Sequence, residues 1–82
     1  MQGSHPLIML YMMSECAFCK SAQAFFDDQK IRYTTIDITD NPQAREEMIK
    51  KSGQPGVPVV TIGDKVFIGF NRGAIENELS NE

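Results

Sequence analysis

Two cysteines, Cys16 and Cys19, have only two residues between them and are the only cysteines in the chain of 82 residues. The apolar run of residues 7–13 leads into them and suits a buried strand that is apolar on both faces. Ser14, a residue type that often caps helices, follows that run. The next apolar residues, Phe18, Ala22, Phe25 and Phe26, recur at helical spacing, which predicts a helix over residues 17–30. Phe25 and Phe26 are expected to pack on the sheet. The cysteine pair therefore lies at a predicted strand-to-helix junction, with Ser14 as the expected cap.

The remaining segments alternate between strand and helix patterns. Three have the β-branched, alternating composition of strands, and two have helical spacing. The predicted strands are residues 31–38, 59–62 and 65–68, and the predicted helices are residues 42–51 and 72–79. Asn41 and Asn71 are the expected N-caps of the two helices, and Gly53 is the expected C-cap of the first. Gly63 and Asp64 form the two-residue turn of a hairpin.

These segments give the order β-α-β-α-β-β-α, which is an α/β fold. A strand–helix–strand connection normally returns the chain to its sheet in parallel, so both such crossings are expected to give parallel pairing. The hairpin adds an antiparallel pair, and we expect one four-stranded mixed sheet flanked by three helices. On the second helix, Glu46 with Lys50 and Glu47 with Lys51 are spaced to pair on a solvated face.

Composition limits the kind of protein. The length suits a single domain, residues 1–82, in which residues 1–6 are either disordered or a cloning remnant. A net charge of −3 and scattered basic residues argue against nucleic-acid binding. No apolar stretch approaches the ~20 residues of a membrane span, and the start lacks the pattern of a signal peptide, so we expect a cytoplasmic protein. We also expect it to be a monomer. Cytoplasmic thiols stay reduced, which favours a metal-binding or redox role for the pair over a structural one.

The position of Cys16 at a helix start favours redox chemistry. Free amides and the positive end of the helix dipole stabilise an anion there, so the thiol ionises more easily and becomes the exposed nucleophile. Cys19, one turn further on, is expected to be more buried. Cys16 would attack a substrate disulfide, and Cys19 would then displace the reduced product. One alternative is that both cysteines are inert core residues. The other is a structural zinc site, but such a site usually has four protein ligands, and this chain offers only two thiols and His5.

The sequence resembles a glutaredoxin-like member of the thioredoxin superfamily over residues 7–79. The motifs that carry the resemblance are residues 11–20, 53–58 and 62–70. The resemblance implies a thioredoxin-like fold with Cys16 as nucleophile, Cys19 as resolving thiol and a cis bond between Val57 and Pro58 that faces them. The Val57 backbone would then pair with a substrate strand, as in β-strand addition. We expect no tightly bound cofactor or metal besides the redox-active disulfide of the pair.

Several positions depart from the glutaredoxins that use glutathione. Met13 occupies the place of a common lysine, Pro55 that of a basic residue, and Asn71 lies where those proteins have an acid-containing turn. Gly56 replaces a threonine, whereas Gln54 matches a glutamine that helps bind glutathione. Each lost charge-assisted hydrogen bond removes roughly 1.5–3 kcal/mol, so we expect weak glutathione binding.

The dipeptide Gly69-Phe70 resembles instead the glutaredoxin-like electron donors of ribonucleotide reductase, which thioredoxin reductase reduces. We therefore expect a dithiol–disulfide oxidoreductase that reduces protein disulfides and receives electrons from a thioredoxin reductase-like enzyme. The alternatives are a glutathione-dependent glutaredoxin and a carrier that bridges an iron–sulfur cluster between two subunits. The residues expected to contact the substrate are Met13, Phe18, Gln54, Val57, Pro58, Gly69, Phe70 and Asn71.

Overall fold

The computed structural model describes residues 7–80, so the expectation for residues 1–6 lies outside the described part of the chain. The elements follow in the predicted order: β1 (Ile8–Met12), α1 (Ala17–Asp28), β2 (Thr34–Asp37), α2 (Pro42–Ser52), β3 (Val59–Ile62), β4 (Lys65–Ile68) and α3 (Arg72–Ser80). The strands form one four-stranded mixed sheet. This order and this sheet confirm the predicted thioredoxin-like α/β fold.

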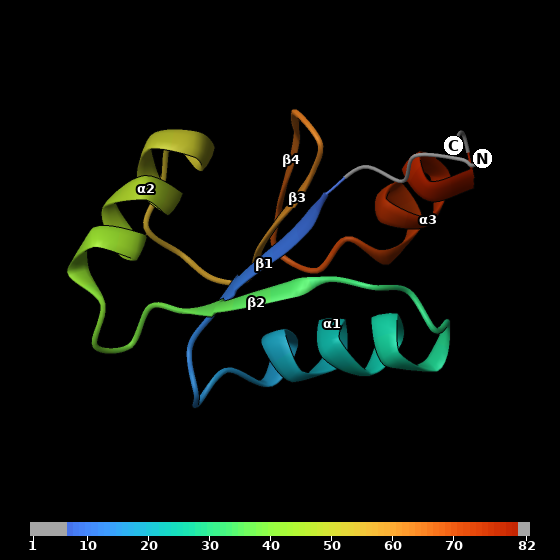
Figure 1. The fold of residues 1–82 in the computed structure, drawn as a ribbon, viewed down its shortest axis with the longest axis horizontal. Coiled ribbons are helices and arrows are strands. Elements are labelled where there is room, and N and C mark those ends of the chain that lie inside the picture. The colour runs from blue at the N-terminus through green and yellow to red at the C-terminus, as the bar shows by residue number, and fades with distance from the viewer. Residues whose placement is uncertain (1–6, 81–82) are drawn as a thin grey trace.

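The strands lie in the order β2-β1-β3-β4, with β1 between β2 and β3. β1 and β2 are parallel as predicted, but β3 is antiparallel to β1, so the prediction of a second parallel crossing is wrong. The reason lies in the path of α2. After β2 the chain forms α2 and returns through residues 53–58 to the same end of the sheet that it left (Figure 1). The start of β3 therefore lies next to the end of β1.

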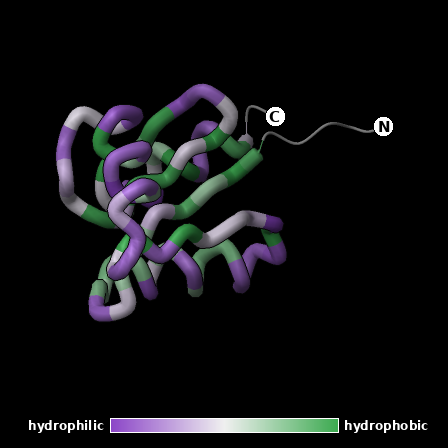
Figure 2. Tube along the Cα trace, turned by 60° about the vertical axis from the view of Figure 1, so that its left-hand side comes forward, coloured by the Kyte–Doolittle hydropathy of each residue, from purple (hydrophilic) through white to green (hydrophobic). Residues whose placement is uncertain are grey.

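Helices cover both faces of the sheet, with α1 and α3 on one face and α2 on the other (Figure 1). The core beneath α1 and α3 consists of Ile8, Leu10, Ala22, Phe25, Phe26, Val60, Ile62 and Ile75. The core beneath α2 consists of Tyr11, Ile38, Met48 and Val59. In Figure 2 the green, hydrophobic segments lie mostly inside the molecule and the purple, hydrophilic segments mostly along its outside. The prediction that Phe25 and Phe26 pack on the sheet is confirmed.

α1 ends two residues earlier than predicted, and β2 is shorter than predicted at both ends. Lys30 has a left-handed backbone with φ of 57°, and its N–H donates to the carbonyl of Asp27. The N–H of Ile31 donates to the carbonyl of Phe26. This is the hydrogen-bond pattern of a Schellman C-cap, in which Lys30 takes the position that glycine usually fills. Residues 29–31 therefore close the helix and do not join the sheet.

The two charged pairs of α2 are exposed but have different partners. Lys50 Nζ lies 3.7 Å from Glu46 Oε1, as predicted, and both side chains are exposed. Glu47 and Lys51 instead share the hydroxyl of the buried Tyr11, which donates to Glu47 Oε2 at 3.1 Å and accepts from Lys51 Nζ at 2.9 Å. The bond to Tyr11 raises the pKa of Lys51. Glu47 and Lys51 are exposed, as predicted, but each bonds to Tyr11 and not to the other, because a buried hydroxyl needs hydrogen-bond partners.

Gly53 and Gly73 are expected to respond in opposite ways to substitution by alanine. Gly53 is the C-cap of α2 with φ of 77°, whereas Gly73 lies in the first turn of α3 with open space around it. A left-handed alanine is strained, so Gly53→Ala should lower the free energy of unfolding by about 1 kcal/mol. Gly73→Ala should raise it by about 0.5 kcal/mol, because alanine restricts the unfolded chain. Urea denaturation measures both changes, and equal signs would contradict this account.

Candidate active site

Three chain segments meet at the end of the sheet where β1 finishes. Tyr11 lies opposite Val59, so the chain that leaves β1 passes beside the loop that enters β3. β4 ends at the same place, where the N–H of Gly69 donates to the carbonyl of Pro58 at 2.8 Å. The peptide bond before Pro58 is cis, as the resemblance implied. The antiparallel β3 therefore brings residues 57–58 to the end of the sheet from which the cysteine segment begins (Figure 1).

Cys16 is the N-cap of α1, so the prediction of Ser14 as the cap is wrong. The Cys16 backbone is extended, and its Sγ accepts the N–H of Cys19 at 3.1 Å. Cys19 is fully buried, as predicted, whereas Cys16 is half-buried. A disulfide joins the two residues, whose Cα atoms lie 5.2 Å apart. The more accessible sulfur therefore lies at the helix start, with a backbone donor directed at it.

Ser14 lies outside the helix because its loop is bound to the end of β2. Its backbone N–H donates to Thr39 Oγ1 at 3.3 Å. The N–H of Thr39 in turn donates to Asp37 Oδ1 at 2.9 Å, and the hydrogen bonds from Thr39 lower the pKa of the Asp37 carboxyl. Thr39 was not among the predicted site residues, since a single threonine after a strand forms no distinctive pattern. Thr39 connects β2 to the loop that leads into Cys16.

Val57 has backbone groups that no described residue uses. Across residues 7–80, neither its N–H nor its carbonyl oxygen takes part in a hydrogen bond. Its neighbours on both sides are held, since Gly56 bonds to Gln54 and Pro58 accepts from Gly69. The Val57 side chain packs against the core beneath α2. The loop therefore offers one free peptide edge at the end of the sheet that carries the cysteines.

Two apolar side chains close to Cys16 in the chain face solvent. Phe18, between the two cysteines, is 67% exposed, and Met13 is 39% exposed. Helix α1, which contains Phe18, buries its other large apolar residues, Phe25 and Phe26. An apolar rim of Met13 and Phe18 therefore lies next to the reactive pair, where a partner could cover it.

Three other residues expected to contact the substrate have internal partners. Asn71 caps α3 by accepting the N–H of Ala74 at 3.2 Å. Phe70 is half-buried, with its ring 5.8 Å from that of Phe25. The side-chain amide of Gln54 bonds to both backbone groups of Gly56. Their role in substrate binding stays a prediction, and each also stabilises the chain near the site.

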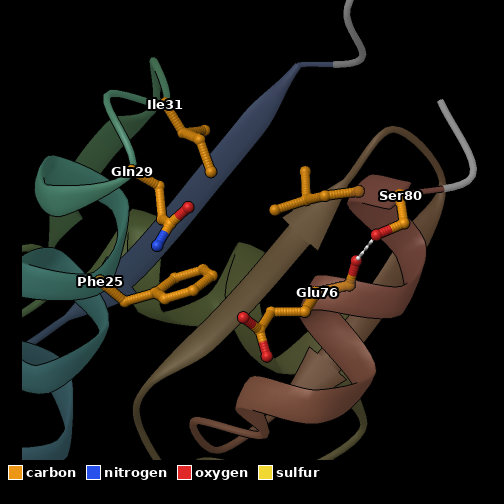
Figure 3. A pocket seen from close by; sticks show the side chains of 6 residues that line it. Phe25, Gln29, Ile31, Glu76 and Ser80 are labelled. Carbon is orange, nitrogen blue, oxygen red and sulfur yellow. Dashed lines mark hydrogen bonds between the residues drawn. The ribbon is translucent and has the colours of Figure 1, made fainter.

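A hollow of about 210 Å³ lies elsewhere, between the C-terminal part of α1 and α3 (Figure 3). It is lined by Phe25, Gln29, Ile31, Glu76, Leu79 and Ser80, none of which was expected to contact the substrate.

Within residues 7–80, no three His, Cys, Asp or Glu side chains gather as a metal site would require. In the same range, no helix is long and apolar enough to cross a membrane.

A thioredoxin-like sheet with a CxxC disulfide at the start of its first helix defines a thiol–disulfide oxidoreductase. The profile of the glutaredoxin family matches residues 8–68, and the chain therefore belongs to the glutaredoxin family.

Individual relatives include proteins named glutaredoxin and a protein named glutaredoxin-like. The chain is 34% identical over 62 residues to glutaredoxin 3 of Escherichia coli K12, a match that covers 76% of this chain and 74% of the relative. It is 28% identical over 64 residues to the glutaredoxin-like protein NrdH of Lactococcus lactis, covering 78% and 88%. The crystal structure of a glutaredoxin from Archaeoglobus fulgidus superposes with a TM-score of 0.82 at 27% identity, covering 94% and 88%.

Proposed function

We propose that this protein reduces disulfides of other proteins and receives its electrons from a thioredoxin reductase-like enzyme. The observation that carries the proposal is the free Val57 peptide edge at the end of the sheet that carries Cys16. An extended peptide can add to such an edge through main-chain hydrogen bonds. A protein substrate has these groups on both sides of its disulfide cysteine, whereas a small non-peptide disulfide lacks them.

In the proposed reaction, the Cys16 thiolate attacks one sulfur of the substrate disulfide. The substrate S–S bond breaks, a mixed disulfide with Cys16 forms, and the released sulfur takes up a proton. Cys19 then loses its proton and attacks Cys16 Sγ, which releases the second substrate sulfur as a thiol. Two electrons pass to the substrate, and the two cysteines end as the disulfide. The Cys19 N–H that bonds to Cys16 Sγ supports the thiolate form of Cys16.

The choice of electron donor rests on what surrounds the pair. Met13 offers no charge to a glutathione carboxylate, and the Asn71 oxygen already caps α3. The Gln54 amide is bonded to Gly56. A missing charge-assisted hydrogen bond weakens binding by about tenfold or more. These contacts favour a protein reductase over glutathione. A reducing compartment suits this chemistry, and we place the protein in the cytoplasm as a monomer.

The donor is tested by following reduction of the oxidised protein in two coupled assays with insulin as substrate. One assay contains NADPH and thioredoxin reductase, and the other contains NADPH, glutathione reductase and glutathione. We expect the first to be at least about tenfold faster, corresponding to the affinity lost with one such bond. Efficient turnover with glutathione alone would establish the glutathione-dependent alternative instead. A visible absorption band in protein purified without oxygen would establish the cluster carrier.

A further inference from the structure

The side-chain amide of Gln54 is bonded to the loop in the way that a neighbouring strand would be. Gln54 Oε1 accepts the N–H of Gly56 at 2.8 Å, and Gln54 Nε2 donates to the carbonyl of Gly56 at 3.1 Å. Two residues that exchange both main-chain hydrogen bonds form the hydrogen-bonded pair of an antiparallel sheet. The amide of Gln54 therefore satisfies both backbone groups of Gly56.

Gly56 makes room for this amide because it lacks a side chain. A Cβ added at Gly56 would lie 2.8 Å from Gln54 Oε1, closer than Cβ atoms approach other heavy atoms in real structures. A side chain at Gly56 would therefore force the Gln54 amide to shift, which the end of a flexible side chain can do at little cost. Any larger residue at this position displaces the Gln54 amide.

The amide is anchored on the end of α2. Gln54 Nε2 also lies 3.3 Å from Ser52 Oγ, and that hydroxyl lies 2.8 Å from the carbonyls of Met48 and Gln54. Gly53 closes the helix by donating its N–H to Ile49. A continuous set of hydrogen bonds thus runs from the last turn of α2 to Gly56, directly before Val57.

We propose that Gln54 and Gly56 are specificity-determining positions that prepare the Val57 edge for an extended peptide. Gln54 holds the chain before Val57, and Gly69 holds Pro58 after it, so the free N–H and carbonyl of Val57 are fixed in place. A peptide that pairs with a fixed edge loses less free energy to ordering the loop. The inference rests on the proposed function, because it concerns how protein disulfides are preferred over small ones.

The test compares two substrates of the pre-reduced protein in single-turnover reactions, without any reductase. Insulin supplies a peptide disulfide, and 5,5′-dithiobis(2-nitrobenzoate) supplies a disulfide with no peptide groups. Gln54→Ala and Gly56→Ala are each expected to lower the ratio of the insulin rate constant to the small-disulfide rate constant by about tenfold, or about 1.4 kcal/mol. The double variant should lower the ratio no further, because both substitutions remove the same contact.

Matched controls separate this effect from a general loss of structure. Gln43→Ala and Gly73→Ala make the same changes at exposed positions and should leave the ratio within about twofold of the original, as surface substitutions do. Gln54→Glu keeps the shape but cannot donate to the Gly56 carbonyl, so its ratio should fall between those of the original protein and Gln54→Ala. A variant that unfolds loses both rate constants together and is recognised by its thermal melting curve. If Gln54→Ala or Gly56→Ala unfolds, the ratio of rate constants for Gln54→Glu, compared with that of the original protein, tests the proposal.

Two results overturn the assignment of Gln54 and Gly56. One is an unchanged ratio in folded single variants, and the other is a double variant whose loss equals the sum of the two single losses. A different result concerns the proposed function itself: if the unsubstituted protein reduces the small disulfide but not insulin, protein-disulfide reduction fails, whatever the variants do.

Discussion

Replacing Cys16 with serine is expected to lower insulin reduction by at least about a thousandfold, because a serine hydroxyl does not ionise near neutral pH and cannot start the exchange. Cys16 is the accessible member of the pair, and its Sγ faces a backbone donor. The measurement is the initial rate of insulin reduction with dithiothreitol as the electron donor, which avoids the question of the natural reductase. A Cys16→Ser protein that keeps the original rate would show that another group performs the attack.

The matched variant is Cys19→Ser, which keeps the proposed nucleophile, Cys16, and removes the proposed resolving thiol. It should form a mixed disulfide with the substrate that no longer resolves within the protein. Mass spectrometry of the product under non-reducing conditions should find the substrate bonded to Cys16. The complete burial of Cys19 makes the opposite assignment, with Cys19 as the attacking sulfur, inconsistent with substrate access. An adduct at Cys19 in the Cys16→Ser protein would contradict these roles.

Phe26→Ala is expected to give the largest loss of stability, about 3–5 kcal/mol in the free energy of unfolding. The Phe26 side chain is fully buried, and its ring centre lies 5.3 Å from that of Phe25 and 4.9 Å from that of Tyr33. Removing the ring leaves a cavity beneath α1 that the surrounding core fills only in part. A domain of this size has little stability to lose, so the variant should be partly unfolded at 37 °C.

Phe18→Ala makes the same change in the same helix at an exposed position. It should alter the free energy of unfolding by no more than about 0.5 kcal/mol, because Phe18 is mostly in solvent. Its effect should appear in the Michaelis constant for insulin, since Phe18 belongs to the apolar rim beside Cys16. Urea denaturation measures the free energy of unfolding of both variants, provided that its dependence on urea concentration (the m-value) is the same for the two. Equal losses of stability would mean that the burial of Phe26 does not set its contribution.

The sequence predicted the elements because each carries a local signal. Residues 8–12 are apolar on both faces, Asn41 and Asn71 cap their helices, and Gly53 has the left-handed backbone of a C-cap. The end of α1 had no such signal. Lys30 adopts a conformation usually taken by glycine, and the packing of Ile31 against the core accompanies it. With lysine in place of glycine, the usual sequence signal for this cap is absent, so the boundary was misplaced.

The site was predicted in part for the same reason. Spacing identified Cys16 and Cys19, and a resemblance, not a pattern of residues, supplied the cis bond at Pro58. The helix N-cap was assigned to Ser14 because serine is the commoner cap, whereas the hydrogen bond from Ser14 to Thr39 leaves Cys16 in that position. The direction of β3 depends on the path of α2 through space, which the order of elements does not determine.

Because β3 is antiparallel to β1, the thiols and the free peptide edge come from distant parts of the chain. Residues 8–30 include both thiols, yet the peptide edge beside them comes from residues 57–58, which only the complete sheet brings near. A synthetic fragment of the first strand and helix would therefore retain thiol chemistry without the means to recognise a polypeptide. Under the proposed function, selectivity for proteins depends on the assembled sheet, and it should vanish on unfolding even where the reactivity of the cysteines survives.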